Sequence, residues 1–394
     1  MFQKDLLEKR MSRAYAALEE YHVDLWLSIG RETHFTPEPA LLYLTPASEL
    51  PLCALCVGKT RSVFLVQPLD AEEAQAYGAQ SETVVCGEEL DQPLTEIIKS
   101  FEPLRRVALN FSQVDPSADG LSLTQYRRVM RCLEAAGFSG EIISSCNIMK
   151  RVRAQKSAEE VSGIKQTVLA AMDIYEKARG FVRSGISGKD IQLYFQEQVR
   201  LTGADFSWPK AGNPYVSVGA RSSYLCKRPP DDVFLQPGDL VNVDFGLRIN
   251  GFASDNQRSF YVLDKEEHHA PDEVLRAFEA VQAANRAAVA AAKPGAHTAI
   301  PLRAANDVFE RLGYPKVGGL GHELGTYAHE GGMRFGRAFP IDELDMTLET
   351  GMTFTLEPAI LTSRGRLCQE EDVVITQTGC EMLSTPQREI WLVK

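Results

Sequence analysis

The segment LVNVDFGLRINGFASDNQRSFYV, residues 240–262, constrains the fold of this chain more than any other stretch. Its central Asn250-Gly251 is the dipeptide that two-residue type I′ hairpin turns prefer, and residues of high β propensity flank it on both sides. With the turn at this dipeptide, Asp255 lies diagonally across from Asp244 on the same face of the hairpin. The segment therefore predicts an antiparallel hairpin that brings two carboxylates together.

The paired carboxylates have two interpretations. Two carboxylates at such range repel each other unless a cation or a proton lies between them, and divalent ions such as Mn²⁺ prefer oxygen ligands. The alternative is a solvent-exposed hairpin that carries two hydrated aspartates. In the predicted register Gly246 leaves room between the carboxylates, and Gln257 lies opposite Asp244. The hairpin alone leaves both interpretations open.

Further candidate ligands follow along the chain. His322 and His329 lie seven residues apart in the glycine-rich segment GGLGHELGTYAHEGG, where glycine allows the backbone to approach closely. Glu357 follows an alternating strand pattern in TFTLEPAI, and Glu370 and Glu371 lead into the apolar run DVVIT. Glutamates at the head of a buried strand need something to neutralise them. These residues favour a metal site.

The order of these residues resembles that of the creatinase, prolidase and aminopeptidase P family, the M24 pita-bread metallopeptidases. The five metal ligands of that family match, in order and approximate spacing, Asp244, Asp255, His322, Glu357 and Glu370. The resemblance implies an α+β fold. Residues 151–394 would form a pita-bread domain, an antiparallel sheet with flanking helices and an internal pseudo-twofold. Residues 1–150 would form a smaller α/β domain of the creatinase type.

The local patterns agree with this division. Residues 1–150 alternate helical segments with short apolar runs, which is typical of an α/β domain. Ser157 and Glu160 then form a capping-box pattern at the start of a new helix. Segments 178–191 and 287–300 each join a helix to a glycine-containing turn and a second helix start. This echo indicates an approximate internal twofold.

The resemblance also implies a mechanism. Two divalent ions (Mn, Co, Zn or Fe) would activate a water molecule for attack on an amide bond. Glu357 would bind metal and help to transfer the proton, and His329 would donate a hydrogen bond to the substrate carbonyl. Glu370 and Glu371 compete for the place of the last ligand. Counting back from Thr376 selects Glu370.

Several positions depart from the family pattern. Active members carry a histidine upstream of the hairpin, where this chain has Lys227 or Cys226, depending on the count. Lys227 is the candidate to replace it, as a point-charge donor rather than a near-neutral acid and base. Cys368 and Gln369 stand where peptidase members have an arginine, although Arg366 could reach the site from a shifted backbone. The usual threonine of the hairpin is Gln257, which changes the orientation of the ligand opposite it.

Three functions follow from this pattern. The first is a dinuclear metal-dependent hydrolase that resembles Xaa-Pro dipeptidase and aminopeptidase P and cleaves an amide bond of a small peptide. The alternative is a C–N hydrolase of a small metabolite, similar to creatinase or ectoine hydrolase, and the missing histidine and arginine favour it. A binding protein on the same fold is the third, and the complete set of five ligands argues against it.

Composition narrows the partners. A net charge of −11 and a pI near 5.3 argue against nucleic acid or an anionic membrane as a partner. The N-terminus reads as a charged amphipathic helix, no stretch is long and apolar enough to span a bilayer, and the eight cysteines are scattered, which predicts a cytoplasmic protein with reduced thiols. The family resemblance adds the expectation of a homodimer.

Overall fold

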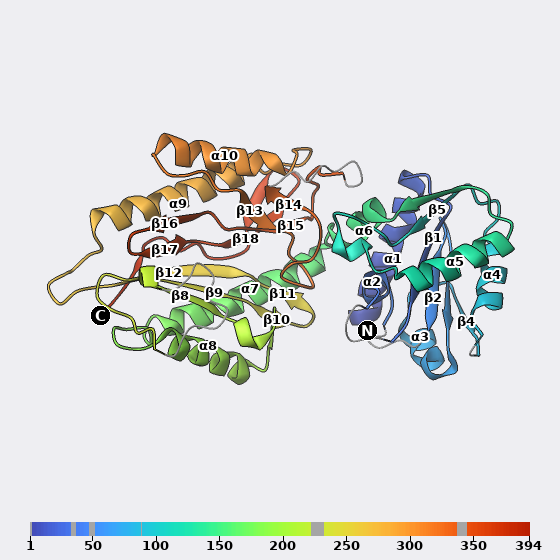
Figure 1. Cartoon of the computed structure of the whole chain (residues 1–394), viewed down its shortest axis with the longest axis horizontal. Coiled ribbons are helices and arrows are strands. Elements are labelled where there is room, and N and C mark those ends of the chain that lie inside the picture. The colour runs from blue at the N-terminus through green and yellow to red at the C-terminus, as the bar shows by residue number, and fades with distance from the viewer. Residues whose placement is uncertain (1, 33–36, 47–51, 88, 222–231, 337–344) are drawn as a thin grey trace. The chain divides into compact units, whose positions relative to one another are not determined.

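The structure is a computed structural model that describes residues 2–32, 37–46, 52–87, 89–221, 232–336 and 345–394. The chain divides into two compact units, with the main boundary between Gln155 and Lys156 (Figure 1). Asp345 also belongs to the first unit. The domain boundary predicted from the sequence, at residue 150, falls inside helix α6 (Cys146–Arg153).

The first unit is an α/β domain built on a mixed six-stranded sheet in the order β4-β3-β2-β1-β5-β6. Its strands are β1 (Leu25–Gly30), β2 (Cys53–Val57), β3 (Ser62–Val66), β4 (Glu82–Val85), β5 (Arg106–Leu109) and β6 (Glu141–Ser144). Its other helices are α1 (Phe2–Glu20), α2 (Pro39–Leu44), α3 (Ala71–Tyr77), α4 (Asp91–Lys99) and α5 (Leu123–Ala135), with short 3₁₀ turns at η1 (Pro68–Asp70) and η2 (Pro116–Ala118). Cys53 and Cys56 are free thiols buried in β2.

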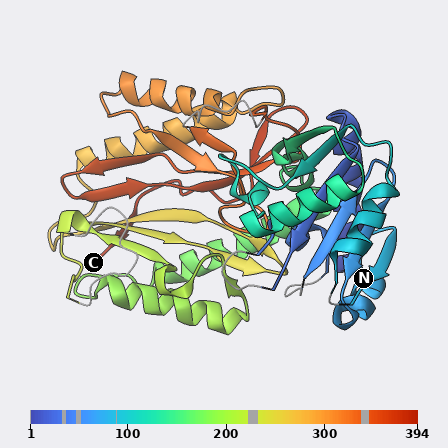
Figure 2. The ribbon, with the colours of Figure 1, turned by 45° about the vertical axis from the view of Figure 1, so that its right-hand side comes forward.

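The second unit places its strands between two pairs of helices (Figures 1 and 2). The helices are α7 (Ala158–Ala178), α8 (Gly188–Thr202), α9 (Asp272–Ala291) and α10 (Ala299–Arg311), with 3₁₀ turns at η3 (Lys210–Gly212) and η4 (Gly219–Arg221). The strands are β7 (Asp205–Phe206), β8 (Tyr215–Val218), β9 (Leu240–Phe245), β10 (Leu247–Ile249), β11 (Phe252–Ala253), β12 (Asn256–Val262), β13 (Gly319–His322), β14 (Arg334–Gly336), β15 (Thr353–Leu356), β16 (Ala359–Thr362), β17 (Gly365–Cys368), β18 (Glu371–Ile375), β19 (Cys380–Met382) and β20 (Trp391–Val393). Its four-stranded sheet has the order β20-β12-β9-β8, and two three-stranded sheets have the orders β11-β10-β7 and β15-β18-β19.

The predicted hairpin forms with the predicted register. Asn250 and Gly251 both have positive φ, 50° and 83°, as a type I′ turn requires. Ile249 pairs with Phe252, and the same register continues down β9 and β12. Because a two-residue turn fixes which residues face each other, this short segment alone determines which side chains share the inner face.

Gly246 serves a different purpose from the one expected. A Cβ atom at this position would lie 2.2 Å from the Ser254 carbonyl oxygen and 2.6 Å from the Trp208 ring. The expectation that Gly246 leaves room between the two carboxylates is therefore wrong. The glycine is needed because a backbone carbonyl and an aromatic ring press against this point of the hairpin.

The internal echo in the sequence corresponds to a repeated structure. Gly185 lies between α7 and α8, has φ +83°, and donates its N–H to the Leu235 carbonyl at 2.9 Å. Gly295 lies between α9 and α10, has φ +82°, and donates to the Leu348 carbonyl at 2.8 Å. Both positions need the left-handed conformation that glycine adopts without strain. Each helix pair is thus tied in the same way to the strand region that follows it.

This repeat places acidic residues at equivalent points of the two halves. Asp244 follows Leu235 by nine residues and lies near the end of β9, whereas Glu357 follows Leu348 by nine residues and comes directly after β15. The two carboxylates therefore approach the centre of the unit from opposite halves.

The described residues include no helix that is both long and apolar enough to cross a membrane. One apolar core of the second unit packs α7 and α8 against the β8–β9–β12 sheet. Its members include Tyr175, Phe195, Val243, Phe245 and Phe260.

Candidate metal centre

Acidic and histidine side chains from distant segments converge in the second unit. One potential ligand atom from each member of three overlapping groups lies within 4.8 Å of the others in its group. The groups are Asp244 with Asp255 and Glu370; His322 with Glu357 and Glu370; and Asp255 with His322 and His329. All five predicted ligands and the second predicted histidine therefore lie in one continuous cluster.

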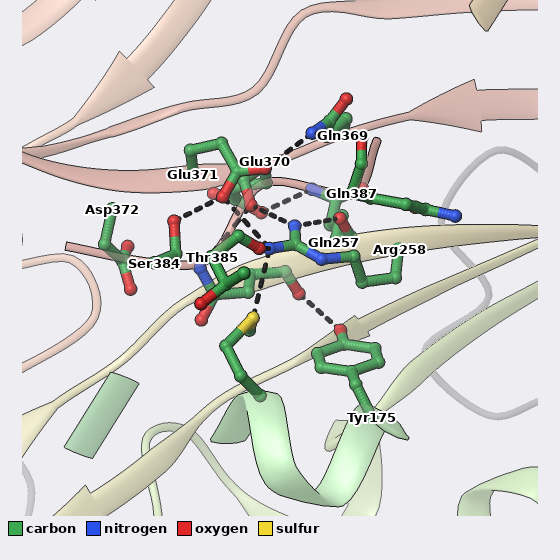
Figure 3. A network of polar contacts seen from close by, with 12 residues as sticks. Tyr175, Gln257, Arg258, Gln369, Glu370, Glu371, Asp372, Ser384, Thr385 and Gln387 are labelled. Carbon is green, nitrogen blue, oxygen red and sulfur yellow. Dashed lines mark hydrogen bonds and ion pairs between the residues drawn. The ribbon is translucent and has the colours of Figure 1, made fainter. Parts of the chain in front are cut away.

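Strand register brings part of this cluster together. Asp244 on β9 pairs with Gln257 on β12, and Gln257 forms a further bridge to Glu370, just before β18. Side chains in such a row point to the same face of the sheet. The hydroxyl of Tyr175 on α7 (Figure 3) lies 2.6 Å from the Asn256 carbonyl and 3.0 Å from the Val243 carbonyl, and it shares its single O–H between them. It thereby links the two hairpin strands beside their aspartates.

His322 presents one ring nitrogen to the carboxylates. Its Nδ1 lies 3.2 Å from the Glu323 carbonyl, which can only accept, so Nδ1 carries the proton. The lone pair on Nε2 then faces Asp255 Oδ2 at 3.7 Å and Glu357 Oε1 at 4.0 Å. Burial lowers the pKa of His322 to about 4, so the ring is neutral at pH 7, which is the form that binds metal ions.

The carboxylates are too close together and too deeply buried to be stable as a bare anionic cluster. Burial, followed by repulsion from Glu357, raises the pKa of Asp244 to about 7. Burial and mutual repulsion raise the pKa values of Asp255 and Glu370 well above their ordinary values. Cations or protons must therefore compensate this charge at neutral pH.

The donor set fits divalent metal ions. Within the described part of the chain, the buried Oδ1 of Asp244 has no hydrogen-bond partner, although an unpaired buried carboxylate oxygen is costly. Several carboxylate oxygens and one neutral imidazole suit Mn, Fe, Co and Zn ions alike. The cluster can therefore hold such ions without rearranging its backbone.

Glu370 and Glu371 point to different surroundings (Figure 3). Glu371 is already neutralised: Arg258 Nη2 lies 3.0 Å from its Oε2, the Ser384 hydroxyl donates to the same oxygen, and Gln369 Nε2 donates to Oε1 at 2.7 Å. Glu370 instead belongs to two of the three groups of the cluster, the one with Asp244 and Asp255 and the one with His322 and Glu357. The structure thus brings Glu370 to the candidate metal centre and leaves Glu371 in a buried ion pair.

The sequence prediction missed Asp372. Its Oδ2 accepts the backbone N–H of Asp255 at 3.2 Å and so fixes the position of that candidate ligand. Burial raises its pKa well above the ordinary value. The available signal was an aspartate inside the apolar run that follows Glu370, where a carboxylate without a partner would be unfavourable.

The predicted catalytic residues differ in how far they can be placed. The His329 ring packs edge-on against His322, with centroids 4.0 Å apart, while the residue remains exposed and accessible to a substrate. Lys227 and Cys226 lie outside the described residues, so the role of Lys227 stays a prediction. Cys368, in the place of the family arginine, is a buried thiol whose Sγ lies 3.7 Å from the Glu357 carbonyl.

Arg366 reaches the edge of the cluster through Gln257. Its Nη1 donates to the side-chain oxygen of Gln257 at 2.7 Å, while Gln257 Nε2 faces two glutamates of the cluster. Arg366 therefore contacts the candidate site through an intervening amide, and its role there stays a prediction.

Known proteins resemble this chain over most of its length. A peptidase of Bacillus subtilis, YqhT, described as uncharacterized, is 26% identical over 84% of this chain and 87% of its own length. The Xaa-Pro dipeptidase of Pyrococcus furiosus is 25% identical over 82% of this chain and 87% of its own. Among solved structures, the Xaa-Pro dipeptidase from Bacillus anthracis has a TM-score of 0.76 at 20% identity, covering 98% of this chain and 100% of that one.

These likenesses agree with the fold. The X-Pro aminopeptidase of Thermotoga maritima also superposes, with a TM-score of 0.74 at 21% identity, over 96% of this chain and 100% of its own. The second unit has the pita-bread fold of these proteins. The model of metallopeptidase family M24 matches residues 162–377, more than half of the 394 residues. The relatives above include Xaa-Pro dipeptidases, and this chain belongs to metallopeptidase family M24.

Proposed function

We propose that this protein hydrolyses a peptide bond of short peptides at a dinuclear metal centre held by Asp244, Asp255, His322, Glu357 and Glu370. The observation that supports this most directly is that four carboxylates and one neutral imidazole converge. One of the buried carboxylate oxygens, Oδ1 of Asp244, has no hydrogen-bond partner among the described residues. Family membership supports the reaction type.

The side chains divide the chemistry between them. When bound, divalent ions supply a water molecule of lowered pKa and polarise the substrate carbonyl. Glu357, which is partly exposed and has a raised pKa from burial, is suited to take a proton from the attacking water and return it to the leaving amine. His329, exposed beside His322, is placed to donate a hydrogen bond to the carbonyl oxygen as negative charge develops there.

The proposed substrates are peptides with proline after the scissile bond. The support is that relatives matching more than four fifths of this chain include a protein named Xaa-Pro dipeptidase. Mn, Co, Zn and Fe are all compatible with this donor set, and availability would choose among them.

One observation favours a second candidate, the hydrolysis of a C–N bond in a small non-peptide metabolite. The family resemblance places an arginine just before the last glutamate, where this chain has Cys368 and Gln369. Cys368 is fully buried, and burial raises the pKa of its thiol well above the ordinary value. A neutral thiol cannot pair with a substrate carboxylate as an arginine does.

A comparison of substrates tests both candidates. Purified protein would be stripped of metal, analysed, reloaded with Mn²⁺ or Co²⁺ and assayed on Xaa-Pro and matched Xaa-Ala dipeptides and tripeptides, and on cyclic and guanidino compounds. We expect metal-dependent cleavage of the Xaa-Pro peptides, which Asp255→Ala abolishes together with metal binding. Turnover of the non-peptide compounds alone would favour the second candidate. Full metal stoichiometry in Asp255→Ala would contradict the proposed centre.

A further inference from the structure

We propose that Gln257, anchored by Arg366, is a positioning residue that binds one oxygen of Glu357 and one of Glu370 and so fixes how these two glutamates face the candidate metal centre. This inference rests on the proposed metal centre. It concerns a position at which the chain departs from the family pattern, because Gln257 stands where that pattern has threonine.

The contacts of the Gln257 side chain define its role. Its Nε2 donates to Glu370 Oε2 at 2.7 Å and lies 3.3 Å from Glu357 Oε2. Its Oε1 accepts from Arg366 Nη1 at 2.7 Å. A guanidinium can only donate and an ionised carboxylate can only accept, so the amide has one possible orientation. The residue is 1% exposed and cannot turn to water instead.

The contact leaves each glutamate with a free oxygen. In Glu357, the oxygen bound by Gln257 is Oε2, whereas Oε1 is the one that faces His322 Nε2, at 4.0 Å. Glu370 likewise gives Oε2 to the amide. Hydrogen bonds of this kind orient carboxylate ligands, so Gln257 sets the direction in which both glutamates present their oxygens.

Two donors are needed for this arrangement. A threonine hydroxyl has a single O–H and can donate to one carboxylate at a time, whereas the glutamine amide has two N–H groups. Only the longer amide can donate to two glutamates while its oxygen faces away from them. The replacement of threonine by glutamine therefore couples Glu357 and Glu370, which come from different strands, through one side chain.

Arg366 keeps the amide in place. It lies on β17, is 4% exposed, and its Nη1 also reaches Asn242 Oδ1 at 3.2 Å. Asn242 is on β9, two residues before Asp244, so the guanidinium is held between two strands of the site. A hydrogen bond from a charged donor polarises the amide and so strengthens the hydrogen bonds that the amide N–H groups donate.

The test measures metal binding rather than turnover. Metal-free wild-type, Gln257→Met, Gln257→Thr, Arg366→Met and Arg366→Lys proteins would be titrated with Mn²⁺ by calorimetry, and their manganese EPR spectra compared. We expect Gln257→Met to weaken at least one site by about 10- to 100-fold and to change the spectrum, because it removes both donors at nearly constant volume. Gln257→Thr should fall between it and the wild type. Gln125→Met, which alters a buried glutamine of the first unit, is the matched control and should bind as the wild type does.

Arg366 provides an independent arm should Gln257→Met not fold. Arg366→Met should weaken Mn²⁺ binding in the same direction, and Arg366→Lys should restore part of the loss. The Gln257→Met/Arg366→Met double variant should lose less than the sum of the two single losses, because part of the Arg366 effect passes through its contact with Gln257. Wild-type Mn²⁺ constants in the Gln257 and Arg366 variants, or losses that simply add in the double variant, would overturn the inference while leaving the proposed function standing. A wild-type protein that binds no Mn²⁺ would overturn both.

Discussion

Lys156 and Glu330 form a buried ion pair, with Nζ 2.5 Å from Oε2 and side chains that are 4% and 1% exposed. Lys156 precedes α7, whereas Glu330 directly follows His329. The second oxygen of Glu330 accepts the backbone N–H of Thr326 at 2.6 Å. The pair therefore fastens the loop that carries His329 to the start of the first helix of its unit.

Replacing Lys156 by methionine should destabilise the protein strongly. The substitution leaves the Glu330 carboxylate buried without its cation, which costs about 3–5 kcal/mol when one partner of a buried pair is removed. Urea denaturation of the metal-free protein would measure the change. Lys177→Met, which breaks the exposed pair of Lys177 with Asp173, is the control and should cost about 1 kcal/mol or less. Similar losses of unfolding free energy in the two variants would mean that the buried pair stabilises the protein no more than the exposed pair does.

Glu370→Gln and Glu371→Gln should have opposite effects. Glu371→Gln weakens the buried pair with Arg258, so the metal-free protein should unfold at a lower temperature yet still bind metal. Glu370→Gln removes one of several repelling carboxylates, so the metal-free protein should be at least as stable as the wild type and gain little from added Mn²⁺. Thermal unfolding with EDTA and with Mn²⁺ would measure both effects. If Glu371→Gln is the variant that abolishes the Mn²⁺ effect, the assignment of the last ligand is reversed.

Replacing His329 by alanine should separate catalysis from metal binding. If this exposed ring donates a hydrogen bond to the substrate carbonyl, its loss should lower kcat by about 10²- to 10³-fold while the metal content stays at the wild-type level. Steady-state kinetics and metal analysis of the same preparation would check this. Because His329 also lies in a group with Asp255 and His322, a parallel loss of bound metal would make it a ligand instead.

The parts of the site that the sequence predicts are those fixed by short-range geometry. The Asn250-Gly251 turn determines the register of its two strands, so the pairing of Asp244 with Gln257 follows from the turn and is confirmed. The repeated helix and glycine pattern is also local in the sequence, and it predicts the internal twofold. The α+β fold class and the M24 resemblance are also confirmed, by the family match and the solved structures.

Contacts between distant segments could not be predicted in this way. Asp372 accepts a hydrogen bond from Asp255, 117 residues away, and Lys156 pairs with Glu330 across 174 residues. Each partner looks like an ordinary charged residue in its own segment, because its environment exists only once the strands have packed. The domain limits, the homodimer and the cytoplasmic location stay predictions.

Glu38 in the first unit should make stability fall as the pH rises. Burial raises the pKa of its carboxyl to about 7, against the hydrogen bonds from Asn110 and Leu41 that favour the ionised form. The unfolded chain releases this proton near pH 4.5, so between about pH 4.5 and 7 the unfolded state binds fewer protons and the free energy of unfolding decreases by about 3 kcal/mol. Glu38→Gln has no carboxyl to titrate, so its free energy of unfolding should not show this decrease. The difference in unfolding free energy, variant minus wild type, should therefore grow by about 3 kcal/mol between about pH 4.5 and 7 when both proteins are measured by urea denaturation from pH 4 to 8. The slope is the evidence, because the new amide also changes the contacts with Asn110 and Leu41; parallel pH profiles for the two proteins would mean that Glu38 titrates normally in the folded state.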